Sequence, residues 1–465
     1  MMLAWGKFYK LKEFYYICKS IMLLQRYFLA KKQSLLRLFL YTGPALIVSM
    51  AYMDPGNYGT DIAGGASLNY SLLWVVWLSS AMAMMLQYLS GKLGIATGKS
   101  LPEIMREKLK KKIFIMPYWL AAEAAAAATD LAEYLGTVIA LNLLFGIPLI
   151  YAAIFGALDV ILILALTTRK FRILERMFIL FVSIIGFGFL YEIFITKPDP
   201  SAILYHSFVP ILANSNALLI SVGIIGATVM PHALFVHSWL TKNKIKDKSI
   251  QEKRTLRKLH LTETVAILTI AGMVNAAIMI IAAAAFHAHF SNIASISDAY
   301  KTLIPLFGLG AGTVFIITLL ASGISSSVVG TLAGQTIMEG LLGMKVNVWL
   351  RRVVTRFINV IPTTIALLLG FDPLSILVYS QVILSLMIPL PMIPLVLLTR
   401  NKAVMGEFVN RNITTIISNC FCWYNIGIQF LSNCNHNHTI KGLFVLYVIV
   451  FRFNNGSKRI YRAAN

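Results

Sequence analysis

Runs of about 20 predominantly apolar residues recur along almost the whole of this 465-residue chain. A helix needs about 20 residues to cross the hydrocarbon core of a lipid bilayer. Hydrophobic residues make up 58% of the chain and charged residues only 13%, which is more apolar surface than a soluble domain of this length can bury. The sequence therefore predicts an all-α polytopic membrane protein.

Ten spans follow from where the apolar runs begin and end. They are 38–65, 70–95, 113–142, 148–167, 172–195, 216–240, 259–286, 308–332, 351–370 and 373–399. We expect residues 38–400 to form a transmembrane core of these ten helices. Residues 1–37 form a basic cytoplasmic segment, and residues 401–465 combine a cytoplasmic loop, a candidate eleventh helix and an irregular tail.

The apolar pattern is less regular at the two ends of the chain than in the core. The first 37 residues fit either an amphipathic segment on the membrane surface or an over-extended translation start, with Met22 as the alternative beginning. They lack the small-residue cleavage site of a signal peptide. Near the other end, the Asn-rich stretch with Cys434, His436 and His438 is interpreted as an altered tail rather than a metal site.

The formal net charge of +22 is concentrated in alternate connections between spans. Seven Lys and Arg residues lie within 92–112 and eight within 242–258, whereas the intervening connections carry few. This alternation follows the positive-inside rule and places those loops and the N-terminus in the cytoplasm. The charge is thus explained by topology in a multi-pass protein of the cell (plasma) membrane, and we expect no nucleic-acid partner.

The first span is interrupted by "AYMDPGNYGT", residues 51–60. Pro55 lacks an N–H and breaks the helix, and Gly56 permits backbone shapes that other residues avoid. A broken backbone is tolerated at membrane depth only where it is buried in protein or lines a wet cavity. Asp54 in such a place is a functional-site candidate, and Asn57 can add an amide oxygen. A simple proline kink with a buried Asp–Arg pair is the alternative.

The sixth span is interrupted in the same way by "GATVMPHALFVHS", residues 226–238, in which Pro231 lies between Met230 and His232. Spans one and six are the first helices of two five-span halves. Paired interruptions at matching positions indicate a binding site at the membrane midplane of an inverted-repeat transporter. Five is an odd number, so the two halves must insert with opposite topology.

The donors available at the two breaks indicate what such a site would bind. They are the Asp54 carboxylate, the Asn57 amide oxygen, the Met230 thioether, and carbonyl groups that Ala51 and Ala227 are placed to present. Oxygen ligands alone suit Mg²⁺ or Ca²⁺. The soft thioether shifts the preference towards Mn²⁺, Fe²⁺, Co²⁺ and Cd²⁺.

Span three carries three carboxylates, Glu123, Asp130 and Glu133, at a spacing that places them on one helical face. Carboxylates inside a membrane are costly unless they are paired or wetted. Candidate partners are His232, which suits a proton relay, and the arginines of span nine, namely Arg351, Arg352 and Arg356. For Arg351, anchoring at the cytoplasmic end of the span is an equal alternative.

Several motifs together resemble a known family. "DPGNYGTDIAGGA", "LQYLSGKLGIATGKSLPE", "ATDLAEYLGTVIALNLLFGIP", "GATVMPHALFVHS" and "GTLAGQTIMEG" are similar to segments of the NRAMP proteins, the proton-coupled divalent metal transporters. The resemblance runs from about residue 38 to about residue 417. It implies a LeuT-like 5+5 inverted repeat with broken first and sixth helices and about 11 transmembrane helices.

The resemblance also implies roles for individual residues. Asp54, Asn57, Met230 and the carbonyl groups of Ala51 and Ala227 would hold the metal. The acidic residues of span three and His232 would serve the proton route, and the presence of Met230 indicates a transition-metal transporter rather than a magnesium or aluminium relative. In span ten, Met387 stands where the family commonly has glutamine, and Gln381 is the remaining candidate contact from that helix.

The function that follows is a proton-coupled symporter that imports Mn²⁺ and Fe²⁺, and also Cd²⁺ and Co²⁺, by alternating access. We expect no permanently bound cofactor, no enzyme activity, and a monomer whose partners are the metal ion, protons and membrane lipid. A LeuT-type Na⁺-coupled amino-acid symporter is disfavoured because Asp54 would repel a substrate carboxylate. A membrane metalloenzyme would need a His-rich motif, and an inactive remnant or metal sensor stays an alternative because of the tail.

Overall fold

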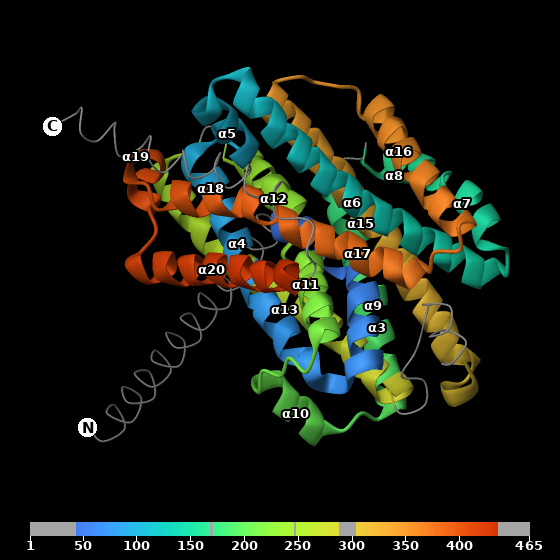
Figure 1. Cartoon of the computed structure of the whole chain (residues 1–465). Helices are drawn as coiled ribbons and strands as arrows, with labels where there is room; N and C mark the ends of the chain where they lie inside the picture. Colours follow the sequence, from blue (N-terminus) through green and yellow to red (C-terminus); the bar gives the residue numbers. More distant parts are fainter. Residues whose placement is uncertain (1–42, 168–170, 246–247, 288–303, 436–465) are drawn as a thin grey trace, which may run out of the picture. The chain divides into compact units, whose positions relative to one another are not determined.

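The computed structural model describes residues 43–167, 171–245, 248–287 and 304–435, and every regular element in these ranges is helical (Figure 1). Residues 1–37, expected to form a basic cytoplasmic segment, lie outside the described residues. Among the described residues, seven helical stretches are long and apolar enough to cross a membrane. They are Pro55–Thr97, Lys112–Phe145, Ile173–Thr196, Ser215–Asn243, Ile250–His287, Leu309–Leu342 and Pro373–Thr399.

The first expected span is broken at Asp54, as predicted. Helix α2 (Pro44–Ser49) continues into the 3₁₀ turn η1 (Met50–Met53), and α3 (Pro55–Leu68) begins after an extended Asp54. A proline at the first helical position suits a helix start because its missing N–H would have no partner there. The break is therefore set by the Asp54–Pro55 pair itself.

The sixth expected span is also broken, between α11 (Ser215–Val229) and α12 (Pro231–Asn243). Met230 separates them with a φ of 34°, a left-handed value that is uncommon for a residue with a side chain. Pro231 then opens α12 as Pro55 opens α3. The two interruptions predicted from the sequence are thus confirmed as matching proline-initiated half-helices.

The remaining helices surround these two broken ones. In the first half they are η2 (Asn69–Leu72), α4 (Leu73–Thr97), α5 (Leu101–Leu109), α6 (Lys112–Phe145), α7 (Leu149–Gly156), α8 (Asp159–Thr167), α9 (Phe171–Thr196) and α10 (Pro200–Phe208). In the second half they are α13 (Ile250–Ala282), η3 (Ala283–His287), α15 (Leu309–Leu342), α16 (Val348–Leu368), α17 (Pro373–Met387), α18 (Pro389–Thr399), α19 (Lys402–Met405), η4 (Gly406–Phe408) and α20 (Asn412–Asn435).

Several expected spans differ from the helices that form. The segment 148–167 is two short helices, α7 and α8, rather than one span. The segment 373–399 is interrupted at Ile388, because Pro389 lacks the N–H that would continue α17. Helix α15 continues to Leu342, well past the expected end at residue 332, and stops at Gly343 with a left-handed φ of 73°.

The chain after residue 417 is more regular than the sequence indicated. Residues 412–435 form one helix, α20, which packs against α11 and α18. Its polar residues Asn425 and Gln429 are buried, and Gln429 donates hydrogen bonds to the Ser385 carbonyl (2.5 Å) and to Asn425 (2.7 Å). The irregularity expected after residue 417 is therefore wrong for the residues up to 435, and the rest of the expected tail, 436–465, lies outside the described residues.

The surface of the helical bundle is apolar in the way a lipid-facing surface should be. Large side chains of α9 and α16 are exposed, among them Phe187, Phe194 and Ile361, with exposed fractions of 72%, 81% and 58%. The interior holds the opposite pattern, since Asp54, Asn57 and His232 are fully buried. This inversion is expected where lipid solvates the outside and a polar site lies within the bundle.

Close helix contacts position the broken helices. Helix α3 packs against α13, α17 and α11, and α12 packs against α4 and α15 (Figure 1). At the contact between α11 and α17, a Cβ atom built on Gly226 would lie 1.9 Å from the backbone oxygen of Gln381. Small residues at such contacts let helix backbones approach each other in a membrane protein.

We predict that Gly226→Ala forces α11 away from α17 and lowers the free energy of unfolding by about 1–3 kcal/mol, the usual cost of overpacking. The matched control is Gly186→Ala in α9, where an added Cβ would meet nothing within 4 Å. Thermal unfolding in detergent should show a lower midpoint for the first variant only. An unchanged midpoint for Gly226→Ala would contradict the close contact.

Candidate functional site

Asp54 is the centre of the first break. Its Oδ1 accepts hydrogen bonds from the backbone N–H (2.8 Å) and the side-chain Nδ2 (2.7 Å) of Asn57, so Asp54 caps α3. The side chain is fully buried, and its Oδ2 has no hydrogen-bond partner within the described part of the chain. A buried carboxylate oxygen without a donor is costly in apolar surroundings and suits a position where a cation binds.

Asn57 joins the two breaks. Its Nδ2 donates a second hydrogen bond, 3.3 Å long, to the Ala227 carbonyl of α11. Its Oδ1 accepts from Thr228 (3.3 Å) and from Asn275 of α13 (3.2 Å). The Asn57 amide therefore lies between the first break, the second break and the seventh expected span.

The two prolines explain why carbonyl groups are available here. In an α-helix the carbonyl of residue i accepts from the N–H of residue i+4. That partner is Pro55 for Ala51 and Pro231 for Ala227, and proline has no N–H. Both alanines are fully buried. The Ala227 carbonyl accepts from Asn57 Nδ2 instead, and Ala51 lies in the 3₁₀ turn η1, where a carbonyl bonds to the residue three positions on rather than four.

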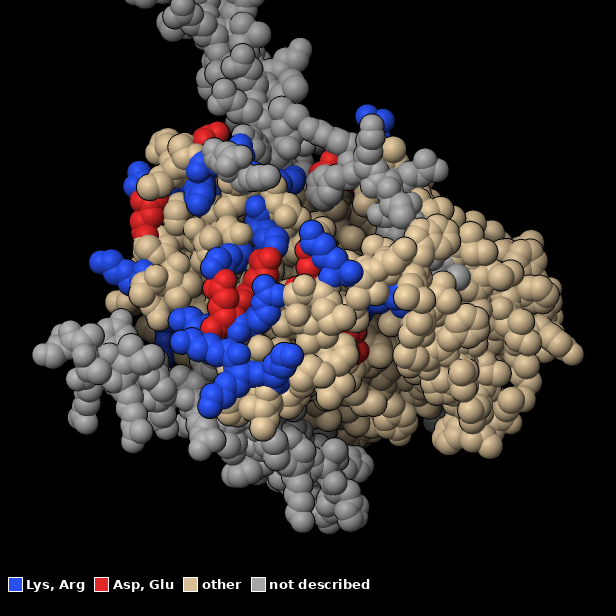
Figure 2. All heavy atoms as spheres, turned by 90° about the horizontal axis from the view of Figure 1, so that it is seen from above, with Lys and Arg blue, Asp and Glu red and all other residues tan. Residues whose placement is uncertain are grey.

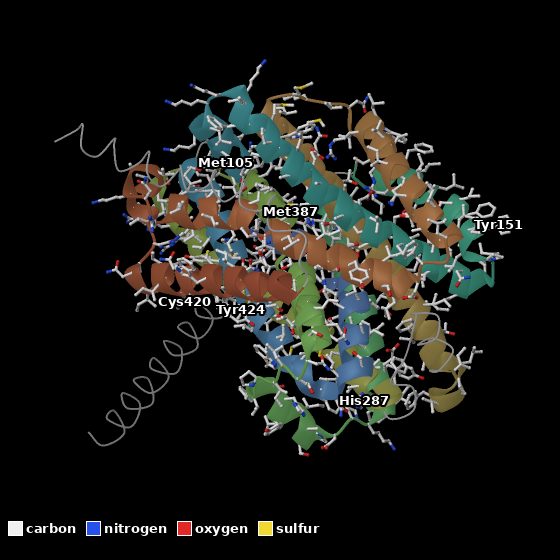
Figure 3. All side chains as sticks on the ribbon, viewed as in Figure 1. Met105, Tyr151, His287, Met387, Cys420 and Tyr424 are labelled. Carbon is white, nitrogen blue, oxygen red and sulfur yellow. The ribbon has the colours of Figure 1, made fainter. Side chains whose placement is uncertain are left out.

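Met230 and Gln381 complete the residues placed near the breaks. Met230 is fully buried at the junction of α11 and α12 and belongs to the same hydrophobic cluster as Ala51 and Met53. The Gln381 amide of α17 lies against Gly56, where an added Cβ would be 2.2 Å from Gln381 Nε2 and 3.0 Å from Asp54 Oδ2. Met387, the departure from the family pattern, lies instead at the end of α17 (Figure 3).

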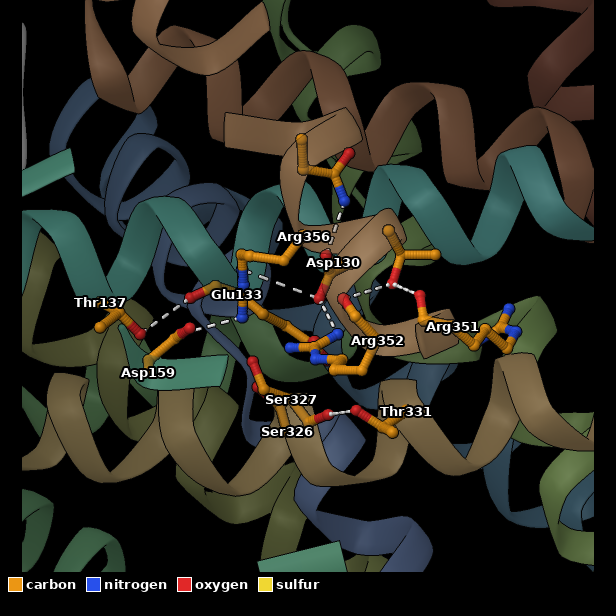
Figure 4. Close-up of polar contacts among 12 residues, drawn as sticks. Asp130, Glu133, Thr137, Asp159, Ser326, Ser327, Thr331, Arg351, Arg352 and Arg356 are labelled. Atoms are coloured by element: carbon orange, nitrogen blue, oxygen red, sulfur yellow. Dashed lines mark hydrogen bonds and ion pairs between the residues drawn. The ribbon is translucent and has the colours of Figure 1, made fainter. Parts of the chain in front are cut away.

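A second polar region links α6 to α16 (Figure 4). Arg352 pairs with Asp130, whose other carboxylate oxygen accepts a 2.6 Å hydrogen bond from Asn359. Arg356 lies 3.8 Å from Asp130 and pairs with Asp159 of α8 at 2.9 Å. Arg352 and Arg356 are 2% and 1% exposed, so the network is buried. These arginines therefore have carboxylate partners, as their position inside span nine indicated.

The other two carboxylates of α6 have different surroundings. Glu123 is partly exposed and pairs with Arg351 at 2.7 Å. Of the two alternatives for Arg351, a carboxylate partner or anchoring at the end of the span, the structure therefore supports the carboxylate partner. Glu133 is fully buried beside α15, where an added Cβ on Gly330 would lie 2.8 Å from its Oε2. Neither carboxylate oxygen of Glu133 has a hydrogen-bond partner among the residues described.

His232 connects the second break to α6. Its Nδ1 lies 3.1 Å from the Thr129 hydroxyl, and Thr129 directly precedes Asp130 in the chain. Its Nε2 is buried and makes no hydrogen bond to any residue that the structure describes. The structure therefore places His232 of the second break in contact with α6, at the residue next to Asp130.

Sequence reasoning missed several residues of these regions. Asn275 and Thr228 contact Asn57, yet a single amide or hydroxyl in an apolar span carries no distinctive pattern. Asp159 pairs with Arg356 from a helix that was expected to be an ordinary span. Another missed contact joins the broken helices: His237 lies 2.8 Å from Gln87, which donates a 2.6 Å hydrogen bond to the Tyr52 hydroxyl.

The site differs from a metal centre built of many ionisable ligands. The described residues contain no group of three or more His, Cys, Asp and Glu side chains that could hold a metal ion. Of the described residues 51–57 and 226–232, Asp54 is the one carboxylate, and it lies with amide, thioether and carbonyl groups; a second buried carboxylate, Asp61, follows in α3.

The chain matches known proteins over most of its length. The family description "Natural resistance-associated macrophage protein-like" (Nramp) matches residues 45–432. A divalent metal cation transporter of Deinococcus radiodurans is 43% identical over 382 residues, which cover 82% of this chain and 86% of that protein. The corresponding transporter of Verminephrobacter eiseniae is 46% identical over 378 residues, covering 81% of this chain and 85% of that protein.

Solved structures show the same arrangement. Crystal structures of a manganese transporter of Eremococcus coleocola align with a TM-score of 0.77 at 31% identity, covering 90% of this chain and 92% of that one. With two broken helices around a buried polar site, the fold defines an integral membrane transporter of the LeuT-like class. The chain belongs to the Nramp family. The family match extends to residue 432, beyond the limit near residue 417 expected from the motifs.

We predict that Asp130→Ala lowers the free energy of unfolding by about 3–5 kcal/mol, because it leaves Arg352 as an uncompensated buried charge. The control is Glu107→Ala, which removes the partner of Lys99 in a pair whose side chains are 51% and 50% exposed. This control should cost at most about 1 kcal/mol. Denaturant titration in micelles measures both values, and equal losses would contradict a special role for the buried pair.

Proposed function

We propose that this protein imports Mn²⁺ and Fe²⁺, and accepts Co²⁺ and Cd²⁺, by proton-coupled alternating access across the plasma membrane. The observation that carries the proposal is the buried Asp54 carboxylate, which accepts a hydrogen bond from the same Asn57 Nδ2 as the Ala227 carbonyl of the second break. The transporter names of the relatives from Deinococcus radiodurans and Eremococcus coleocola support metal as the cargo. The N-terminus lies in the cytoplasm by the positive-inside rule.

Metal binding requires a rearrangement of one side chain. In the described conformation Asn57 Nδ2 points at both Asp54 Oδ1 and the Ala227 carbonyl, so an N–H donor faces the two oxygens. A half turn of the amide would present its oxygen instead and turn Nδ2 towards Thr228 and Asn275. Asn275 then needs to offer its own oxygen, which has no partner among the described residues. The cation replaces the amide N–H as the positive group between Asp54 and Ala227.

Met230 supplies the soft ligand of the proposed site. The donor set is then the Asp54 carboxylate, the Asn57 amide oxygen, the Met230 sulfur and the carbonyls of Ala51 and Ala227. Gln381 is placed to add an amide oxygen from α17. Hard cations gain little from a thioether, whereas Mn²⁺, Fe²⁺, Co²⁺ and especially Cd²⁺ accept it.

The proton route uses the buried groups on α6. Binding of a dication favours loss of a proton from Asp54 or a group linked to it, because the metal charge stabilises the carboxylate. His232, in contact with Thr129, leads from the breaks towards Asp130, Glu133 and Glu123. Arg352 and Arg356 hold Asp130 in place at the far end of this path. An inward-negative membrane potential favours import by about 2.3 kcal/mol per charge per 100 mV.

The alternative of a Na⁺-coupled amino-acid symporter shares the LeuT-like class but not the site. A substrate carboxylate would lie beside the unpartnered Oδ2 of Asp54, and the two anions would repel each other. A metal sensor or an inactive remnant would bind Mn²⁺ without moving it. Flux measurements separate both alternatives from a metal importer.

We predict Mn²⁺ uptake into proteoliposomes together with internal acidification for the intact chain. Asp54→Ala should abolish both, because it removes the carboxylate that we propose as the charged ligand of the metal. The control is Asp199→Asn, which changes an exposed capping residue of α10 and should leave both unchanged. Folded Asp54→Ala protein that still takes up Mn²⁺ would contradict the site, and Mn²⁺ uptake without acidification would contradict the proton coupling.

We further predict that Met230→Leu, which keeps the side-chain volume, weakens Cd²⁺ binding by about tenfold, equivalent to about 1.4 kcal/mol. Mn²⁺ binding should fall less, because Mn²⁺ gains less from sulfur. Isothermal titration of both ions measures the ratio, with Met392→Leu as a control at another fully buried methionine. An equal loss for Cd²⁺ and Mn²⁺ would exclude the sulfur as a selective ligand.

A further inference from the structure

A cavity of about 350 Å³ lies where the first turns of α13 meet η4. It is remote in sequence from both helix breaks and is used by neither the proposed metal site nor the proton route. Its lining residues are Gln251, Arg254, Thr255, Arg257, Lys258, Glu407 and Phe408. Figure 2 shows Lys and Arg side chains gathered on one face of the molecule, with fewer acidic ones among them.

The charges of this cavity do not cancel. Three cations line it against one carboxylate, Glu407. Arg254 donates two hydrogen bonds to Glu407. Its Nε lies 3.0 Å from Oε1, and its Nη2 lies 2.6 Å from Oε2. This hydrogen bonding, with the charges of Arg254 and Arg257, lowers the pKa of Glu407, so the carboxylate stays ionised at neutral pH. The Arg257 guanidinium lies 6.0 Å from the centre of the Phe408 ring, which helps to hold it at the cavity.

The position of the cavity along α13 points to a membrane ligand. Arg254, Lys258, Leu261 and Val265 are spaced by four, three and four residues, so they follow one face of the helix. Leu261 and Val265 are 43% and 45% exposed. An exposed apolar stripe therefore begins one turn beyond the basic residues, on the same helical face. A soluble anion would need the basic residues but would gain nothing from that stripe.

We propose that this cavity binds the phosphate headgroup of an anionic phospholipid, with the acyl chains lying along the exposed face of α13. Arg257, Lys258 and the free edge of Arg254 would hold the phosphate, because guanidinium and ammonium groups form strong charge-assisted hydrogen bonds with it. Gln251 and Thr255 add neutral donors. The positive-inside rule places the cavity at the cytoplasmic leaflet, where anionic lipids attract basic segments next to a membrane helix.

Glu407 allows a variant that should strengthen lipid binding rather than weaken it. Its carboxylate occupies two donors of Arg254 that a phosphate could otherwise use. Glu407→Gln removes the competing negative charge and keeps the side-chain shape. This variant should bind the anionic lipid more tightly than the intact chain, whereas removal of Arg257 and Lys258 should weaken binding.

The test compares the purified full chain in nanodiscs of phosphatidylcholine with nanodiscs that also contain phosphatidylglycerol. We expect phosphatidylglycerol to raise the unfolding temperature of the intact chain, and native mass spectrometry to show retained phosphatidylglycerol. Arg257→Gln/Lys258→Gln should lose both effects, with an apparent affinity at least about tenfold weaker. Lys108→Gln/Lys112→Gln removes the same charge from two exposed residues outside the cavity, in a connection that the positive-inside rule also assigns to the cytoplasm, and should behave as the intact chain.

Three outcomes would overturn the proposal. If phosphatidylglycerol stabilised Arg257→Gln/Lys258→Gln and Lys108→Gln/Lys112→Gln equally, the effect would come from overall charge rather than from a binding site. Stabilisation by inorganic phosphate equal to that by phosphatidylglycerol would assign the cavity to a soluble anion. Lipid retention that is unchanged in Glu407→Gln and in Arg257→Gln/Lys258→Gln would place the lipid elsewhere, and this comparison stays informative if one variant folds poorly.

Discussion

Two missing backbone N–H groups are the constraint on which the rest of this structure depends. Pro55 and Pro231 each stand four residues after an alanine whose carbonyl loses its helical partner. In a lipid-exposed helix such a loss would be expensive, because no water is present to replace the bond. Here both breaks are buried together, and Asn57 bridges them by contacting Asp54 and Ala227. The two breaks therefore bring the Asp54 carboxylate, the Asn57 amide and the Ala227 carbonyl close together.

The surrounding helices are arranged so that these breaks can be buried. Gly226 lets α11 approach the Gln381 backbone, and Gly56 leaves room for the Gln381 side chain. On α6, Asp130 pairs with Arg352 of α16 and Glu123 pairs with Arg351 of the same helix. Two polar regions thus exist within one apolar bundle, and the His232–Thr129 contact connects them. We propose that one binds the cation and the other moves the proton.

Much of this arrangement could be predicted from the sequence, and the limits have physical reasons. Proline breaks an apolar pattern visibly, so both interruptions and the residues beside them were found. Asn275 could not be found, because its importance lies in a contact with Asn57, 218 residues away. The same holds for Asp159, whose partner Arg356 is on another helix. Helix α20 was underestimated because Asn425 and Gln429 look unsuited to a membrane until their buried partners are known.

The most direct test of the account is a crystal structure with Mn²⁺ bound, located by its anomalous scattering. We expect a single strong peak between the two breaks, within ligand distance of Asp54, Asn57 Oδ1, Met230 and the carbonyls of Ala51 and Ala227. The Asn57 amide should be turned by a half rotation, with Asn275 accepting from its Nδ2. A peak elsewhere in the bundle, or Mn²⁺ bound at the breaks with Asp54 turned away, would contradict the central claim that the paired breaks form the metal site.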